Sequence, residues 1–281
     1  MNLLKKIIFL DIDGTLMNDN GVIPESATLA IRKARENGHL VLICTGRSRN
    51  IIFPEILEVG FDGMIGAAGG YIEIGDNILF HEQIKKENIQ HVVEFFDTHE
   101  IDFFLESNEG TFSSKNGKRR MLSVIESYLL DKPDFKDEIE KGFMPFYEML
   151  IEGEDLIRED INKICFFGSD YLSFESIAQE FESTFTNTPS TVSAFGNGGE
   201  LSLRGINKST AIMKVIEHFN ISKEHTFAFG DSFNDLEMLQ FVQYGIAMGN
   251  AHEAVKKVAD DVTDSHDENG IYNSFKKYGL I

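Results

Sequence analysis

Short apolar segments that recur along the chain constrain its fold more than any other feature. Residues 7–10 and 40–44 are continuous apolar runs, and residues 61–67, 226–230 and 244–248 also have the length and composition of strands. A continuous apolar run of this length is typical of a strand buried on both faces of a parallel sheet. Helical patterns separate the runs, so the sequence predicts an α/β fold with a mostly parallel sheet.

Three helices are predicted around this sheet. Residues 24–37 form one, because a proline stands near the start and Gly38 follows the end. Ile212, Val215, Ile216 and Phe219 follow the i, i+3, i+4, i+7 spacing of an amphipathic helix. A shorter helix is expected over residues 251–259.

The middle of the chain has a pattern of its own. Its apolar residues predict three helices and three further strands, enough to carry a separate core. We therefore expect an inserted α/β domain over residues 83–190, while residues 1–82 and 191–281 form one domain across the insertion. The predicted helices lie around residues 89–96, 121–128 and 177–181, and the strands at 101–105, 110–113 and 161–167.

The net charge of the chain argues against partners that are themselves strongly negative. With 46 acidic and 26 basic residues, the formal net charge is −20, whereas proteins that bind nucleic acid present a basic surface to the phosphates. We expect no nucleic-acid partner and no attraction to anionic membranes. No feature of the sequence indicates an obligatory protein partner. A phosphorylated substrate would need local positive charge, from a metal ion or a few cationic side chains.

The sequence also bears on the location of the protein. No apolar run approaches the ~18 residues of a membrane-spanning helix, and the four apolar residues before Asp11 are too few for a signal-peptide core. Cys44 and Cys165 lie inside apolar runs, as buried cysteines do, and indicate no disulfide framework. We therefore expect a cytoplasmic protein.

Acidic residues follow two of the predicted strands. In open α/β sheets, ligands bind at the carboxyl ends of strands. Asp and Gly are also common in ordinary turns, but the repetition at a second strand end favours a functional site. The two segments are Asp11-Ile12-Asp13-Gly14-Thr15 and Gly230-Asp231-Ser232-Phe233-Asn234-Asp235.

Two further segments carry groups that bind anions. Thr45 and Gly46 follow the second strand, where a hydroxyl and backbone amides can hold phosphate oxygens, although threonine is also a common helix N-cap. Lys208 begins a predicted helix, where its charge opposes the helix dipole. Such a lysine either binds an anion or is simply exposed.

Taken together, these groups can converge on one crevice. Asp11 and Asp231 supply hard oxygen ligands that suit Mg²⁺. Lys208, Thr45 and the loop amides are suitable ligands for a phosphate group. The combination predicts a site for a magnesium ion and a phosphorylated substrate.

This ordered set resembles the haloacid dehalogenase (HAD) superfamily, and within it the Cof-like phosphatases. The resemblance covers essentially the whole chain and implies a Rossmann-like core with a parallel sheet and a large inserted α/β cap that sets substrate specificity. The matching segments are Asp11-Ile12-Asp13-Gly14-Thr15, Thr45-Gly46-Arg47, Lys208, Gly230-Asp231-Ser232-Phe233-Asn234-Asp235, Ala247-Met248-Gly249-Asn250-Ala251 and Asn269-Gly270-Ile271.

The resemblance also implies a reaction. A phosphatase of this kind would use Mg²⁺ to hydrolyse small phosphorylated metabolites, such as sugar phosphates, nucleotides or phosphorylated cofactors, through an aspartyl-phosphate intermediate. Asp11 would be the nucleophile, and Asp13 the general acid and base. The Asp11 and Asp231 carboxylates and the Asp13 backbone carbonyl would bind the metal.

The remaining roles follow from the same resemblance. The transferring phosphoryl group would be held by the amides of Ile12 and Gly46 and by the side chains of Thr45, Lys208 and Asn234. Asp235 would orient a water molecule or Lys208. Arg47 would either face the cap and substrate or form a structural salt bridge.

Two alternatives and one departure stay open at this stage. A phosphomutase of the same superfamily has the same motifs and returns the phosphoryl group to a sugar. A receiver-like regulatory phosphoprotein also combines Asp, Thr, Lys and Mg²⁺, although Asp13 and the large cap argue against it. Many relatives carry Asn-Gly-Ala where this chain has Ala68-Gly69-Gly70, so a substrate contact from that loop is in doubt.

Overall fold

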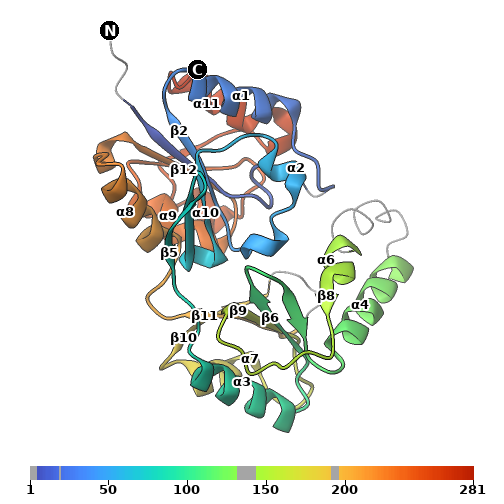
Figure 1. Cartoon of the computed structure of the whole chain (residues 1–281). Coiled ribbons are helices and arrows are strands. Elements are labelled where there is room, and N and C mark those ends of the chain that lie inside the picture. Colours follow the sequence, from blue (N-terminus) through green and yellow to red (C-terminus); the bar gives the residue numbers. More distant parts are fainter. Residues whose placement is uncertain (1–4, 19, 132–143, 191–195) are drawn as a thin grey trace. The chain divides into compact units, whose positions relative to one another are not determined.

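The structure is a computed structural model that describes residues 5–18, 20–131, 144–190 and 196–281. The chain divides into two compact units (Figure 1). The first unit contains the residues up to Arg47 together with residues 52–81 and 206–281, and the second contains residues 48–51 and 82–205. Among the described residues, none of the helices combines the length and apolar composition that crossing a bilayer requires.

An eight-stranded sheet forms the centre of the first unit. Its strand order is β14-β13-β12-β1-β2-β3-β4-β5. The pairs from β14 to β3 are parallel, which confirms the predicted parallel sheet, and β4 and β5 are added antiparallel at one edge. The elements are β1 (Ile7–Leu10), α1 (Glu25–Glu36), β2 (Leu40–Cys44), α2 (Pro54–Leu57), β3 (Gly63–Gly66), β4 (Tyr71–Ile74), β5 (Asn77–His81), α8 (Lys208–His218), β12 (Thr226–Gly230), α9 (Leu236–Phe241), β13 (Tyr244–Ala247), α10 (Glu253–Lys256), β14 (Asp261–Val262) and α11 (Gly270–Lys277).

Several features of this unit differ from the sequence-based expectation, which also lacked α2, α9 and β14. The β4–β5 hairpin was not predicted, because its strands are short: the apolar run of β5 has only the three residues 78–80, and Ile78 and Leu79 are exposed. The helix expected over residues 251–259 is limited to the four residues of α10. Helix α11 was also missed, although Ile271 and Phe275 place an i, i+4 pair in the core.

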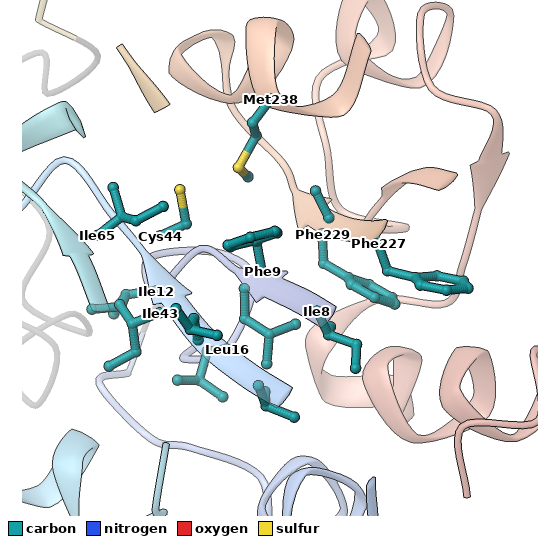
Figure 2. Packing of buried hydrophobic residues seen from close by; sticks show 14 of the residues in the cluster. Ile8, Phe9, Ile12, Leu16, Ile43, Cys44, Ile65, Phe227, Phe229 and Met238 are labelled. Atoms are coloured by element: carbon teal, nitrogen blue, oxygen red, sulfur yellow. The ribbon is translucent and has the colours of Figure 1, made fainter. Parts of the chain in front are cut away.

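Apolar side chains fill both faces of the parallel strands. Helices α1 and α11 contact each other, and Phe275 of α11 lies against Phe229 of β12 with ring centroids 5.5 Å apart. Successive residues of a strand point to opposite faces, and Figure 2 shows Phe9 directed to the side that carries Met238 of α9, while Ile8 points away from it. Because β1 is completely buried, it needs an apolar residue at every position.

The order of the strands determines where a ligand site can form. From β1 the chain leads outward through β2 and β3, whereas β12, β13 and β14 extend in the other direction. The order therefore reverses between β1 and β12, and α/β sheets bind ligands beside such a reversal, at the carboxyl ends of the strands. Leu10 pairs with Phe229, and the Asp11 amide donates to the Phe229 carbonyl at 3.1 Å, so Asp11 and Asp231 emerge at the same edge.

The second unit has its own six-stranded sheet, in the order β10-β11-β9-β6-β7-β8. This unit continues to Gly205, beyond the boundary expected at residue 190, because β11 pairs with both β9 and β10. The elements are α3 (Lys86–Thr98), β6 (Phe103–Ser107), β7 (Thr111–Ser113), α4 (Gly117–Asp131), α6 (Met144–Met149), β8 (Leu150–Ile151), β9 (Ile161–Phe166), α7 (Phe174–Phe181), β10 (Phe185–Pro189) and β11 (Gly199–Leu203).

A short segment from early in the chain also belongs to the second unit. Residues 48–51 precede the rest of that unit by about thirty positions. The Ser48 hydroxyl donates to Oε2 of Glu106 at 3.0 Å, and the Asn50 amide donates to the Thr111 hydroxyl at 2.9 Å. The division between the units is therefore not a single insertion, since this segment contributes to the second unit as well.

Several phenylalanine rings meet in the core of the second unit. Phe96 of α3 is fully buried, and its ring centroid lies 5.4 Å from that of Phe103, 5.3 Å from that of Phe166 and 5.8 Å from that of Phe181. Aromatic pairs at such separations contribute stability beyond their buried area. Phe96 therefore connects helices α3 and α7 to the sheet.

We predict that Phe96→Ala destabilises the second unit by about 3–5 kcal/mol, because the substitution leaves a cavity among rings that cannot collapse around it. Tyr171→Ala is the matched control, since Tyr171 is 82% exposed, and it should change stability by less than about 0.5 kcal/mol. Urea unfolding followed by circular dichroism would measure both. Similar losses in the two variants would contradict the assigned role of Phe96.

Candidate active site

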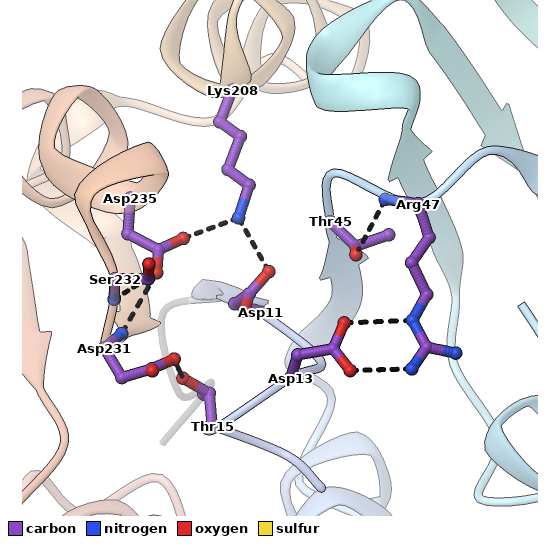
Figure 3. A network of polar contacts seen from close by, with 9 residues as sticks. All are labelled: Asp11, Asp13, Thr15, Thr45, Arg47, Lys208, Asp231, Ser232 and Asp235. Atoms are coloured by element: carbon purple, nitrogen blue, oxygen red, sulfur yellow. Dashed lines mark hydrogen bonds and ion pairs between the residues drawn. The ribbon is translucent and has the colours of Figure 1, made fainter. Parts of the chain in front are cut away.

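A buried lysine links two of the predicted site loops. Lys208 is the first residue of α8, and its Nζ donates to Oδ1 of Asp11 at 2.6 Å and to Oδ1 of Asp235 at 2.5 Å. Figure 3 shows the amine between the two carboxylates. The Lys208 side chain is only 1% exposed, so this residue is an internal cation rather than the exposed lysine of the alternative interpretation.

Electrostatics explains why Lys208 stays charged. Burial by itself lowers the pKa of a lysine, but Asp11 and Asp235 more than offset this effect and hold the Lys208 pKa above its usual range. The pKa of Asp11 is also well above its ordinary value. Burial is the largest cause, the nearby Asp235 carboxylate adds to it, and Lys208 opposes it. The site thus concentrates negative charge that one lysine does not fully balance.

Asp235 organises the loop that follows β12. Its Oδ2 accepts hydrogen bonds from the amides of Asp231 and Ser232, both at 3.0 Å. Gly230 is required here, because a Cβ at this position would lie 2.5 Å from the Asp235 carboxyl carbon. Both carboxylate oxygens of Asp235 are therefore engaged by Lys208 and the loop, which matches the expected orienting role better than a direct role as metal ligand.

The turn after Asp11 contacts Asp231 closely. The Thr15 hydroxyl donates to Oδ1 of Asp231 at 2.9 Å. Gly14 has a φ of +76°, and a Cβ there would lie 2.3 Å from Oδ2 of Asp231. Glycine is needed for both reasons: it adopts the left-handed backbone at little cost, and it leaves room for the carboxylate.

The carboxylates provide oxygen ligands in one place. Ligand atoms of Asp11, Asp231 and Asp235 lie within 4.8 Å of one another. Because Asp235 is engaged elsewhere, Asp11 and Asp231 remain as the candidate ligands, and hard carboxylate oxygens fit Mg²⁺. Burial, with the nearby Asp235 carboxylate, raises the pKa of Asp231 to about 7. A bound cation would stabilise both carboxylates in the charged form.

Asp13 and Arg47 form a pair on the other side of Asp11. Arg47 donates from Nε to Oδ2 of Asp13 at 2.9 Å and from Nη2 to Oδ1 at 2.6 Å. The two parallel hydrogen bonds hold the Asp13 side chain away from the Asp11, Asp231 and Asp235 cluster (Figure 3). Of the two roles considered for Arg47, the salt bridge is the one that the structure contains.

The predicted phosphate-binding residues are distributed around this cluster. The Thr45 hydroxyl accepts a hydrogen bond from the Arg47 amide at 3.2 Å. The Asn234 amide nitrogen lies 3.5 Å from where a Cβ on Gly46 would be, so these two residues are neighbours. Ile12 contributes its backbone to the turn, where its carbonyl accepts from the Thr15 and Met17 amides, and its side chain is buried.

The unusual Ala68-Gly69-Gly70 segment has a structural role. The amide of Ala68 donates to the Thr45 carbonyl at 3.1 Å. Ala68 has a φ of +53°, a conformation that asparagine adopts more readily than alanine. At Gly69, a Cβ would lie 2.3 Å from the Asn207 carbonyl. This loop therefore packs tightly against the start of α8, which carries Lys208.

The sequence-based assignment gave no role to several residues that shape the site. Asn207 caps α8 by accepting from the Thr210 amide, and Thr210 reciprocates. Thr15 and Asn250 each contact a site loop, Thr15 at Asp231 and Asn250 at the Gly14 carbonyl. Asn207 just before a helix is a recognisable N-cap signal, whereas the partners of Thr15 and Asn250 depend on tertiary contacts.

Comparisons with known proteins agree with this geometry. The sequence model of the haloacid dehalogenase-like hydrolase family matches residues 8–275. The chain is 26% identical to the phosphatase YwpJ of Bacillus subtilis, over 96% of this chain and 99% of that protein. It is 27% identical to the 5-amino-6-(5-phospho-D-ribitylamino)uracil phosphatase YcsE of the same organism, over 98% and 96%.

A solved structure shows the same architecture. The HAD subclass IIB sugar phosphatase BT4131 has a TM-score of 0.77 and 25% identity, and the match covers 99% of this chain and 100% of that one. The family match spans nearly the whole sequence and includes every loop of the site. The chain therefore belongs to the haloacid dehalogenase-like hydrolase family and is a phosphoric monoester hydrolase.

Proposed function

We propose that this enzyme hydrolyses small phosphorylated metabolites in the cytoplasm, with Mg²⁺ as cofactor and a covalent phosphate on Asp11 as intermediate. The observation that carries the proposal is the position of Asp11. It is buried where the strand order reverses, it is bound to Lys208, and the Asp231 carboxylate lies beside it. This is the arrangement that a carboxylate nucleophile and a neighbouring cation site require.

The metal would be held by Asp11 and Asp231, with the Asp13 backbone carbonyl as the third protein ligand. It would supply positive charge that lets an anionic carboxylate approach an anionic phosphate. Lys208 adds a fixed positive charge on the other side of Asp11 and holds that carboxylate in one orientation.

In the first chemical step, a carboxylate oxygen of Asp11 attacks phosphorus, and the bond from phosphorus to the leaving oxygen breaks. In the second step, water attacks the phosphorus of the aspartyl phosphate, which frees the Asp11 carboxylate and inorganic phosphate. We assign the phosphoryl oxygens to the amides of Ile12 and Gly46 and to the side chains of Thr45, Lys208 and Asn234, which come from the loops after β1, β2 and β12 and from the start of α8.

Asp13 is the proposed proton carrier. It would protonate the leaving oxygen in the first step and accept a proton from water in the second. In the structure both of its oxygens accept hydrogen bonds from Arg47, and each oxygen keeps a second lone pair that can take a proton. Arg47 thus holds the Asp13 carboxylate in one orientation.

The relatives indicate the class of substrate. YcsE is named for a phosphorylated ribitylamino-uracil, and BT4131 is named as a sugar phosphatase. What the two named substrates have in common is that each is a small phosphorylated metabolite. We infer the same broad class here and assign the choice among such substrates to the second unit. That unit has its own core and contains none of the assigned catalytic residues, so it can vary without altering the chemistry.

Asp11→Asn tests the nucleophile. The amide has nearly the same size as the carboxylate but is a poor nucleophile, so turnover should fall by roughly 10³-fold or more while the circular dichroism spectrum is unchanged. Mass spectrometry after an acid quench should detect a phosphorylated Asp11 peptide only in the wild-type enzyme. Wild-type turnover by a folded Asp11→Asn protein would refute the proposal.

Asp13→Ala tests the proton donor. An alkyl phosphate releases a strongly basic oxygen, whereas an aryl phosphate releases an acidic phenol that needs little protonation. We expect Asp13→Ala to slow release of the alkyl leaving group by about 10²–10⁴-fold, and release of the aryl group much less. Single-turnover release rates are the proper measurement, because the second step needs Asp13 as a base for every substrate. If Asp13→Ala slowed release of both leaving groups equally, Asp13 would not be the proton donor.

The Asp231 carboxyl predicts a pH dependence of stability. Its pKa is about 7 in the folded protein, above its ordinary value of 3.8, so the stability that this group contributes is complete below about pH 4 and is lost as the pH rises through 7. In the presence of a chelator, unfolding in urea should therefore become easier between about pH 5 and pH 8. Asp231→Asn should reduce this slope, and Mg²⁺ should restore stability to the wild-type protein. An equal slope in the variant would show that Asp231 is not the titrating group.

A further inference from the structure

The loop after β13 contacts both of the loops that carry the candidate metal ligands. Its Met248 amide donates to the Gly230 carbonyl at 3.0 Å, and its His252 amide donates to the Asp231 carbonyl at 3.1 Å. These backbone bonds fix the loop, formed by residues 248–252, to the segment that carries Asp231. The loop has no role in the reaction proposed above.

One side chain of this loop reaches the other ligand-bearing segment. The Asn250 amide nitrogen donates to the Gly14 carbonyl at 2.7 Å. Gly14 directly follows Asp13, whose carbonyl is the third proposed ligand, and precedes Thr15, whose hydroxyl binds Asp231. Asn250 is therefore a second connection between the Asp231 segment and the turn after Asp11.

The segment formed by residues 264–266 orients the Asn250 side chain. Its carbonyl oxygen accepts a hydrogen bond from the His266 amide at 3.3 Å, and the neighbouring Gly249 amide donates to the Asp264 carbonyl at 3.1 Å. A Cβ on Gly249 would lie 2.6 Å from the Ser265 nitrogen. The close approach of these segments leaves the Asn250 amide directed at Gly14.

The Asn250 bond adds an external restraint to the turn at Gly14, whose amide also donates within the turn to the Met17 carbonyl at 2.9 Å. Glycine loses more conformational freedom on folding than any other residue, and a left-handed glycine has no Cβ to limit its backbone. Small rotations of this turn would move the Asp13 carbonyl relative to the Asp231 carboxylate. Hydrogen bonds that orient metal ligands from outside the coordination sphere are worth about 10- to 100-fold in metal affinity.

We propose that Asn250 is a positioning residue for the magnesium site, which fixes the Gly14 turn so that the Asp13 carbonyl and the Asp231 carboxylate face one ion. The inference rests on the metal dependence in the proposed function. It assigns to an exposed side chain a role that acts through the Gly14 turn.

The test is Mg²⁺ binding without substrate, measured by isothermal titration calorimetry on the full-length protein. Asn250→Ala should raise the dissociation constant for Mg²⁺ about tenfold, while the unfolding midpoint in chelator stays at the wild-type value. Asn250→Ser is a second variant, since its hydroxyl is too short to reach Gly14, and it should show the same loss. Asn273→Ala is the matched control: Asn273 is an exposed asparagine that bonds Asp264 and Glu268 and not the Gly14 turn.

The outcomes separate this inference from the proposed function. Wild-type Mg²⁺ affinity in both Asn250 variants would overturn the inference alone, as would an equal loss in Asn273→Ala. A wild-type protein that binds no Mg²⁺ would overturn the inference together with the proposed metal dependence.

Discussion

The ion pair between Lys208 and the carboxylates of Asp11 and Asp235 is the interaction on which the site depends. A buried ion pair stabilises a fold little compared with apolar residues of the same size, but the loss of one partner is costly because it leaves an unpaired buried charge. Lys208 begins α8, Asp11 follows β1 and Asp235 follows β12. The pair thus forces three distant segments to meet, and each carries a group that the proposed reaction uses. Lys208 is therefore needed both to balance the buried carboxylates and to hold Asp11 for the proposed reaction.

The sheet makes that meeting possible. Because β1 and β12 are adjacent and in register, their carboxyl ends bring two acidic loops to one edge without any long connection. Glycines then let the loops approach: Gly14 makes room for the Asp231 carboxylate, and Gly230 makes room for Asp235. The price is a crowded set of like charges, which appears as the raised pKa values of Asp11 and Asp231. A cation bound by Asp11 and Asp231, as proposed, would relieve the repulsion.

The parallel strands could be predicted from the sequence because a strand buried on both faces must be apolar at every position, as β1 is. Short strands with exposed residues on both faces, such as β5, give no such signal. The site residues could be located because each follows a strand or begins a helix. Their hydrogen-bond partners could not be predicted. Arg47 and Asp13 are 34 positions apart in the sequence, and Asn250 and Gly14 are 236 positions apart, so these contacts form only in the folded protein. Such pairings arise from the packed fold and not from local pattern.

Because of residues 48–51, the two units alternate along the sequence more than once. These residues directly follow Thr45-Gly46-Arg47, yet Ser48 and Asn50 supply hydrogen bonds to Glu106 and Thr111. Transplanting residues 82–205 from another protein would remove those acceptors and leave the Ser48 and Asn50 donors facing a foreign surface. Exchange of the second unit by recombination must therefore carry this four-residue segment with it, or be followed by compensating changes there. Sequence drift in the two stretches is expected to be correlated for the same reason.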